Sequence, residues 1–237
     1  MQHYSFGWHS DRLFRQMDFQ HFGDAGAPVI VFPTTLGNHY EFSDRNMIDP
    51  ISWKIDQGLI QVFCVDSING ESWYNSNIHP HEKVRRHVLY EEYLIHEFFP
   101  YVRQKTGTEY LILFGCSFGG FHAINFTLKH PELVDRAISL SGSFTIEGFL
   151  NGYYDELCYY NNPAHYMQNM NDSFYIDRYN LSTELNIVTS DWDVCRDRNE
   201  HFHRLLTEKG IRHNYYFWDG HTNHDWPTWQ KMIAHYL

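Results

Sequence analysis

The sequence predicts an α/β fold in which a mainly parallel central sheet carries helices on both faces. Short apolar runs alternate along the chain with segments whose apolar residues recur at helical spacing, as successive βαβ crossovers require. The 237 residues suffice for one sizeable core, and α/β folds of this length are commonly one unit. We therefore expect residues 1–237 to form a single domain.

The N-terminal segment predicts an antiparallel edge on this sheet. Residues 4–20 alternate loosely between aromatic and polar side chains, with a turn near residues 9–11, which is typical of a strand pair. Exposed edge strands can pair with a second copy of the chain, so a homo-oligomer is one possibility.

The rest of the chain supplies the alternating strands and helices. A helix is expected over residues 80–107, because its apolar residues recur at helical spacing and Gly107 can end it. The strands are expected at 29–32, 59–66, 111–114, 134–140, 185–189 and 214–218, and the other helices at 118–130, 198–209 and 226–237.

Residues 144–182 break the alternation. They are rich in tyrosine and asparagine but show no single helical period. A segment so aromatic is unlike an ordinary linker. We expect an insertion that packs over the carboxyl edge of the sheet, where ligands bind in parallel α/β folds.

Composition excludes several kinds of partner. The chain has 29 acidic and 18 basic residues, with a formal charge of −11, so nucleic acid and anionic membrane surfaces would be repelled. No apolar run is long enough to span a bilayer, and residues 1–10 lack the pattern of a signal peptide. The four cysteines form no CxxC pair, which favours reduced thiols in the cytoplasm.

One motif points to chemistry. Gly115-x-Ser117-x-Gly119 lies where a buried strand turns into a helix, and glycines on either side give the two backbones room to approach. The helix would aim free N–H groups at a developing oxyanion. Ser117 is therefore the candidate nucleophile, although a glycine-rich turn can also hold an ordinary serine. Cys116 is expected to pack into the core.

A nucleophilic serine needs a base and an acid, which should follow it in the chain. The loop after the strand at 185–189 carries Asp191 and Asp193, and the loop after the last strand carries His221 and His224. Both loops lie at the carboxyl ends of strands, where ligands bind in parallel sheets. The residues alone do not decide between Asp191 and Asp193 as the acid, or between His221 and His224 as the base.

Several motifs extend this pattern over nearly the whole chain. They are Val31-Phe32-Pro33-Thr34-Thr35, Val65-Asp66-Ser67, Glu71-Ser72-Trp73-Tyr74, Gly115-Cys116-Ser117-Phe118-Gly119-Gly120, Ser141-Gly142-Ser143-Phe144, Asp191-Trp192-Asp193 and His224-Asp225-Trp226-Pro227-x-x-Trp229. Together they resemble the esterase branch of the α/β-hydrolase superfamily, which includes esterase D-like enzymes and mycolyl-transferring antigen proteins. The resemblance implies the α/β-hydrolase fold.

The resemblance also implies roles for single residues. It assigns the base to His224 and the acid to Asp193. From the residues alone, His221 is the alternative base and Asp191 the alternative acid. It places the oxyanion hole at the backbone N–H groups of Phe118 and Thr35. The sequence here, Thr34-Thr35-Leu36-Gly37, departs from the small residue and second glycine usual in relatives, so Leu36 is the alternative donor. Asp225 is expected to cap the last helix.

The remaining site predictions concern the pocket and metals. Trp73, Tyr74 and Leu36 are expected to line a substrate pocket with aromatic residues of the insertion, although an aromatic-rich chain places such residues near any cleft. His79-Pro80-His81 is the nearest approach to a metal motif, but no HExxH or Cys/His cluster accompanies it. Neither a metal nor a cofactor is expected.

These observations predict a serine hydrolase that cleaves small-molecule carboxylic esters through an acyl-enzyme. An acyltransferase, a thioesterase or a carbohydrate acyl esterase would use the same triad, and a non-catalytic binding module could keep the same fold.

Overall fold

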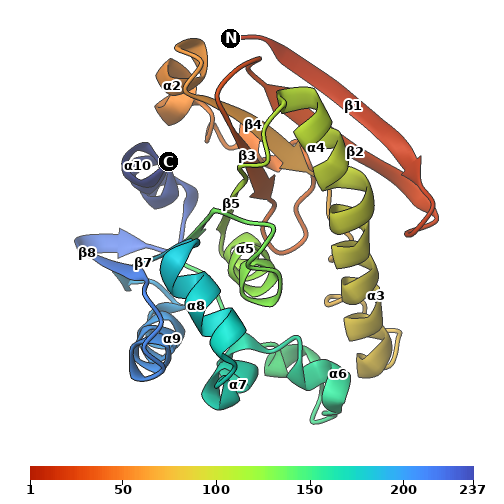
Figure 1. The fold of residues 1–237 in the computed structure, drawn as a ribbon, viewed down its shortest axis with the longest axis vertical. Helices are drawn as coiled ribbons and strands as arrows, with labels where there is room; N and C mark the ends of the chain where they lie inside the picture. Colours follow the sequence, from red (N-terminus) through yellow and green to blue (C-terminus); the bar gives the residue numbers. More distant parts are fainter.

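An eight-stranded sheet forms the centre of the computed structural model, which describes residues 1–237 (Figure 1). The strand order is β1-β2-β4-β3-β5-β6-β7-β8. The pairs β1/β2 and β2/β4 are antiparallel at one edge, and all other neighbours, from β4/β3 to β7/β8, are parallel. The strands are β1 (His3–Ser10), β2 (Arg15–Phe22), β3 (Ala27–Phe32), β4 (Ile60–Val65), β5 (Ile112–Cys116), β6 (Arg136–Leu140), β7 (Glu184–Trp192) and β8 (Asn214–Asn223). The expected parallel sheet with an antiparallel edge is confirmed.

Helices cover both faces of this sheet. Side chains alternate along β3, so that Val29 and Val31 face one layer while Ile30 and Phe32 face the other. The first layer holds α2 and α10, and the second holds α3, α4 and α5 (Figure 1). The helices are α1 (Glu41–Asp44), α2 (Ser52–Asp56), α3 (Pro80–Tyr93), α4 (Phe99–Thr106), α5 (Phe118–Lys129), α6 (Glu156–Tyr159), α7 (Pro163–Tyr166), α8 (Ser173–Leu181), α9 (Arg196–Glu208) and α10 (Trp226–Tyr236). None of them is both long and apolar enough to cross a lipid bilayer.

The helix predicted over 80–107 is continuous but contains one wide π turn at Leu94–Phe98, between α3 and α4. Pro100 has no N–H to offer the carbonyl four residues earlier, so the regular bonding pattern cannot run through this point. The helix ends as expected at Gly107, which adopts a left-handed φ of 70°.

The last two strands are longer than the sequence predicts. The strand expected at 185–189 extends to Trp192, and the strand expected at 214–218 extends to Asn223. The Asp191 carboxylate accepts hydrogen bonds from the backbone N–H groups of His221 and Thr222, each at 2.8 Å, and so ties the two strand ends together. Polar, exposed strand ends of this kind carry no apolar alternation that would reveal them.

The insertion at 144–182 divides into two parts. Its first residues pack against α5 through Ile146 and Leu150, beside the serine turn. Its later helices, α7 and α8, pack on the flank formed by α5 and α9 through Tyr166 and Tyr179 (Figure 1). Tyrosines of this later part line a separate pocket of about 550 Å³ that shares no residue with the pocket beside Ser117. Only the first part of the insertion therefore reaches the candidate site.

Candidate active site

The turn between β5 and α5 holds Ser117 in a strained conformation. Its φ of 54° and ψ of −119° lie outside the regions that serine normally adopts. A side chain at Gly115 would place its Cβ 2.1 Å from the carbonyl carbon of Gly119, and one at Gly119 would lie 2.4 Å from the Phe32 carbonyl oxygen. The two glycines are thus required by close backbone approach, as the motif predicts.

His224 connects Ser117 to Asp193. Its Nε2 lies 2.9 Å from Ser117 Oγ, and its Nδ1 lies 2.7 Å from Asp193 Oδ1. A carboxylate can only accept, so Nδ1 donates to Asp193 and Nε2 is left to accept the hydroxyl proton. The histidine ring also packs edge to face on Trp229, at a centroid distance of 4.9 Å, which restricts its orientation.

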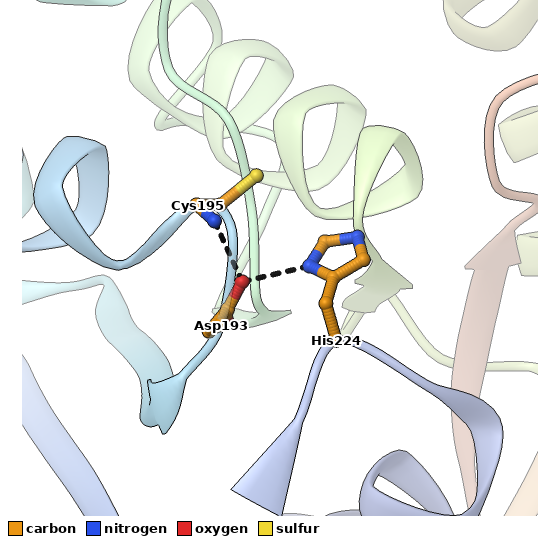
Figure 2. Close-up of side chains that lie close together, drawn as sticks. All are labelled: Asp193, Cys195 and His224. Carbon is orange, nitrogen blue, oxygen red and sulfur yellow. Dashed lines mark hydrogen bonds and ion pairs between the residues drawn. The ribbon is translucent and has the colours of Figure 1, made fainter.

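Asp193 is buried and well supplied with donors (Figure 2). Besides His224, it accepts from the Cys195 backbone N–H at 2.8 Å and from Thr189 Oγ1 at 3.0 Å. Burial alone would raise the pKa of this carboxyl, but the hydrogen bonds from His224, Ser141 and the Cys195 N–H outweigh it and lower the pKa below its ordinary value. Asp193 is therefore ionised at neutral pH.

Asp191 and His221, the alternative acid and base, lie outside the hydrogen-bonded chain of Ser117, His224 and Asp193. The Asp191 carboxylate joins the ends of β7 and β8, as described above, and does not contact His224. The His221 side chain is 73% exposed and packs against Trp192 at a ring distance of 4.3 Å. Asp225 accepts from the Thr228 N–H and caps α10, as predicted.

The cysteines near the site are protonated and unsuited to nucleophilic attack. Cys116 is buried, and burial raises the pKa of its thiol well above the ordinary value. Cys195 lies beside Asp193 and His224 (Figure 2), and burial raises the pKa of its thiol to about 11. Potential ligand atoms of these three side chains lie within 4.8 Å of one another, and His224 donates its Nδ1–H to Asp193 within this group.

A pocket of about 350 Å³ opens beside Ser117. Of the residues predicted for the site, Thr35, Tyr74, Phe118 and His224 line it. Trp73 does not, because its side chain is fully buried against Phe118 and Phe149. Leu36 does not either: it is 64% exposed and lines a neighbouring polar pocket.

The rest of the wall consists of Ser143, Thr145, Gly148, Phe149, Val194, Cys195 and Arg198. Phe149 agrees with the expectation that aromatic residues of the insertion line the pocket, and the other six were not predicted as pocket residues. Ser143 could have been found from its place after a predicted strand. The others come from the insertion and from the start of α9, whose positions depend on tertiary packing that leaves no local pattern.

Two residues that line this pocket, Phe118 and Thr35, have backbone N–H groups without an acceptor in the protein. Phe118 is the first residue of α5, so its N–H has no acceptor within the helix. The Thr35 N–H, in the turn after β3, has no acceptor in the protein. The N–H of Thr34, by contrast, is occupied by the Glu41 carboxylate at 2.8 Å.

The sheet order, the strained serine turn and the position of the site after parallel strands define an α/β hydrolase. The family model described as "Putative esterase" matches residues 56–237, and the chain belongs to that family. It is accordingly an ester-cleaving hydrolase of the carboxylesterase type. No curated protein matches the chain.

Solved structures share the fold at low identity. A ferulic acid esterase is 16% identical with a TM-score of 0.78, covering 100% of this chain and 96% of its own. The S-formylglutathione hydrolase FrmB of Staphylococcus aureus is 15% identical with a TM-score of 0.74, covering 98% and 93%. MPT51 of Mycobacterium tuberculosis is 12% identical with a TM-score of 0.74, covering 99% and 96%.

Proposed function

We propose that the protein is a serine esterase in which Ser117, His224 and Asp193 act as a catalytic triad through an acyl-enzyme. The observation that carries this proposal is the unbroken chain of hydrogen bonds from Ser117 Oγ through His224 to Asp193, with distances of 2.9 and 2.7 Å. Each member then has the role that its position allows.

In acylation, Ser117 Oγ attacks the ester carbonyl and forms a new C–O bond while its proton passes to His224 Nε2. The carbonyl oxygen becomes an oxyanion, which the N–H groups of Phe118 and Thr35 stabilise. The bond to the alcohol oxygen then breaks, and His224 gives its proton to the departing alcohol. Asp193 keeps the ring in the required tautomer and stabilises the imidazolium.

In deacylation, water replaces Ser117 as the attacking group. His224 takes a proton from the water, the new C–O bond forms, and the bond to Ser117 Oγ breaks as the proton returns to the serine. The products are a carboxylic acid and free enzyme. No cofactor enters this sequence of steps.

Other acceptors and substrates would use the same machinery. Transfer of the acyl group to an alcohol differs only in what replaces water, and a thioester differs only in the leaving atom. Relatives described as ferulic acid esterase and S-formylglutathione hydrolase illustrate this range on one fold. A binding module that lacks catalysis is the remaining alternative, and the hydrogen bond between Ser117 and His224 argues against it.

Two further proposals concern the whole chain. The four cysteines are all buried and unpaired, which favours a reducing compartment such as the cytoplasm. Strand β1 has a neighbour on one side only, so its free edge could pair with a second copy. Size-exclusion chromatography with light scattering tests the second proposal.

Hydrolysis of p-nitrophenyl acetate, butyrate and octanoate tests the catalytic proposal. We expect Ser117→Ala and His224→Ala to lose activity by roughly three powers of ten or more, because members of a triad act as a unit. His221→Ala is the matched control and should keep activity, since its ring lies outside the site. An inactive wild type, or equal losses in the His221 and His224 variants, would reject the triad.

A further inference from the structure

The pocket beside Ser117 has a charge balance unlike that of the chain as a whole. The chain carries 29 acidic and 18 basic residues. No aspartate or glutamate lines this pocket, and its only permanently charged side chain is Arg198, from the first turns of α9. A guanidinium stays protonated at any working pH. The wall of the pocket therefore carries a fixed positive charge in an otherwise acidic protein.

Arg198 is not neutralised by a carboxylate of the protein. Its Nη1 donates to Ser143 Oγ at 3.2 Å, and the guanidinium lies beside the Cys195 thiol, but it forms no ion pair. The neighbouring Arg196 differs, since it pairs with Glu200 at 2.8 Å and stacks over Phe217. Most of the five donors of Arg198 thus remain available to a ligand.

The position of Arg198 also defines where a ligand group would lie. Arg198 and Thr145 line both the pocket of Ser117 and an adjoining pocket of about 260 Å³. Acids occur only on the adjoining side, where Glu147 is held by His165 at 3.5 Å and Asp197 lies on α9. An anion is therefore favoured on the side of Arg198 that faces Ser117.

We propose that Arg198 is a specificity-determining residue that binds a carboxylate of the substrate. The preferred substrates are then esters that carry a carboxylate within a few bonds of the ester group. An arginine can hold a carboxylate through two parallel hydrogen bonds. Ser143 Oγ accepts from Arg198, so the Ser143 hydroxyl keeps its own proton as a further donor beside the guanidinium. This inference rests on the proposed function of Ser117.

Two matched substrate pairs test the proposal and locate the anion. In the first pair, 4-acetoxybenzoate and 4-acetoxybenzamide, the charge is on the departing alcohol. In the second, the mono-4-nitrophenyl ester of adipic acid and 4-nitrophenyl hexanoate, it is on the acyl group. The measured quantity is the ratio of kcat/KM for the anionic and neutral member. We expect Arg198→Gln to lower this ratio roughly 10- to 100-fold in at least one pair.

Arg204→Gln is the matched control, because it removes the same charge from an exposed position on the same helix, outside both pockets. Its ratios should equal those of the wild type. Unchanged ratios in Arg198→Gln for both pairs, with Ser117 still labelled by a fluorophosphonate, would overturn this inference alone. Absence of labelling in the wild type would overturn the proposed function and this inference with it.

Discussion

The hydrogen bonds around Asp193 suit this side chain to one role, which is to hold His224. It receives hydrogen bonds from His224, the Cys195 backbone and Thr189, so both carboxylate oxygens are occupied. Asp191, two residues earlier, is also well supplied with donors, but all of them belong to the ends of β7 and β8. Only Asp193 can hold a histidine that also reaches Ser117.

Replacing Asp193 should therefore cost far more activity than replacing Asp191. In Asp193→Asn, an amide N–H facing His224 would favour the wrong tautomer, and we expect kcat to fall roughly 10³- to 10⁴-fold. Asp191→Asn should lose about tenfold or less, because it loosens a strand end without changing the tautomer. Steady-state kinetics of both variants, with circular dichroism as the folding control, makes the comparison. Equal losses would contradict the assignment.

The sequence predicted the kind of catalytic site more reliably than it predicted the individual residues that form it. Ser117 follows from its motif, but the residues alone left two acids and two histidines open, and only the family resemblance chose between them. The pocket residues were harder still. Trp73 is buried beneath Phe118, and Arg198 was not predicted, because exposure depends on how distant segments pack.

The turn from β5 to α5 is the element on which the site depends. Gly115 and Gly119 pack backbone against backbone, and Gly119 also meets the carbonyl oxygen of Phe32 in β3. The turn therefore fixes the position of Ser117 relative to the sheet and places Phe118, the first residue of α5, in the wall of the pocket.

A methyl group at Gly115 should disrupt this turn. In Gly115→Ala the new Cβ would lie 2.1 Å from the backbone of Gly119, which cannot yield without moving the helix. We expect a loss of roughly 3 kcal/mol or more in the free energy of unfolding, or a failure to fold. Gly70→Ala is the control, since its Cβ would meet only Leu36 at 3.7 Å. Equal thermal stability of the two variants would argue against the packing account.

Elements with strong local patterns were predictable and those without were not. The helix ending at Gly107 and the buried strands follow from apolar period and end signals. The extensions of β7 and β8 depend on hydrogen bonds that the Asp191 carboxylate accepts from the backbone of β8. The course of residues 144–182 depends on contacts with α5 and α9. Neither leaves a periodic trace in its own sequence.

A largely buried cluster of polar side chains connects several elements of the molecule. Glu91 of α3 forms an ion pair with Lys129 of α5 and lies 3.3 Å from His87, and Lys129 also donates to Asn161 in the insertion at 2.7 Å. Burial alone would raise the pKa of Glu91, but Lys129 and His87 outweigh it and lower the pKa below its ordinary value. The pair ties α3, α5 and the insertion into one body.

Removing one partner of this group should destabilise the protein. Glu91→Gln leaves Lys129 largely buried without its counter-charge, so we expect a loss of about 3–5 kcal/mol. Glu200→Gln, which breaks the surface pair with Arg196, should leave the melting temperature nearly unchanged and serves as the control. Thermal unfolding followed by circular dichroism at neutral pH makes the measurement. Similar melting temperatures for the two variants would contradict the account.

The pH dependence of the stability that Glu91 contributes follows from the lowered pKa of its carboxyl group. The stability that ionised Glu91 supplies is complete above its ordinary pKa of about 4 and is lost as the pH falls through the lower folded value. The difference in stability between wild type and Glu91→Gln should therefore persist from neutral pH down to about pH 4 and shrink only below it. A difference that disappears between pH 7 and 5 would point to another group.

The central claim is that Ser117 carries the acyl group during turnover. The most direct measurement is rapid acid quenching during hydrolysis of p-nitrophenyl acetate, followed by peptide mass spectrometry. We predict one acetyl group on the peptide that contains Ser117 in the wild type and none in Ser117→Ala. Hydrolysis by the wild type with no acetylated peptide, or with acetyl on another residue, would contradict the acyl-enzyme mechanism proposed for this fold.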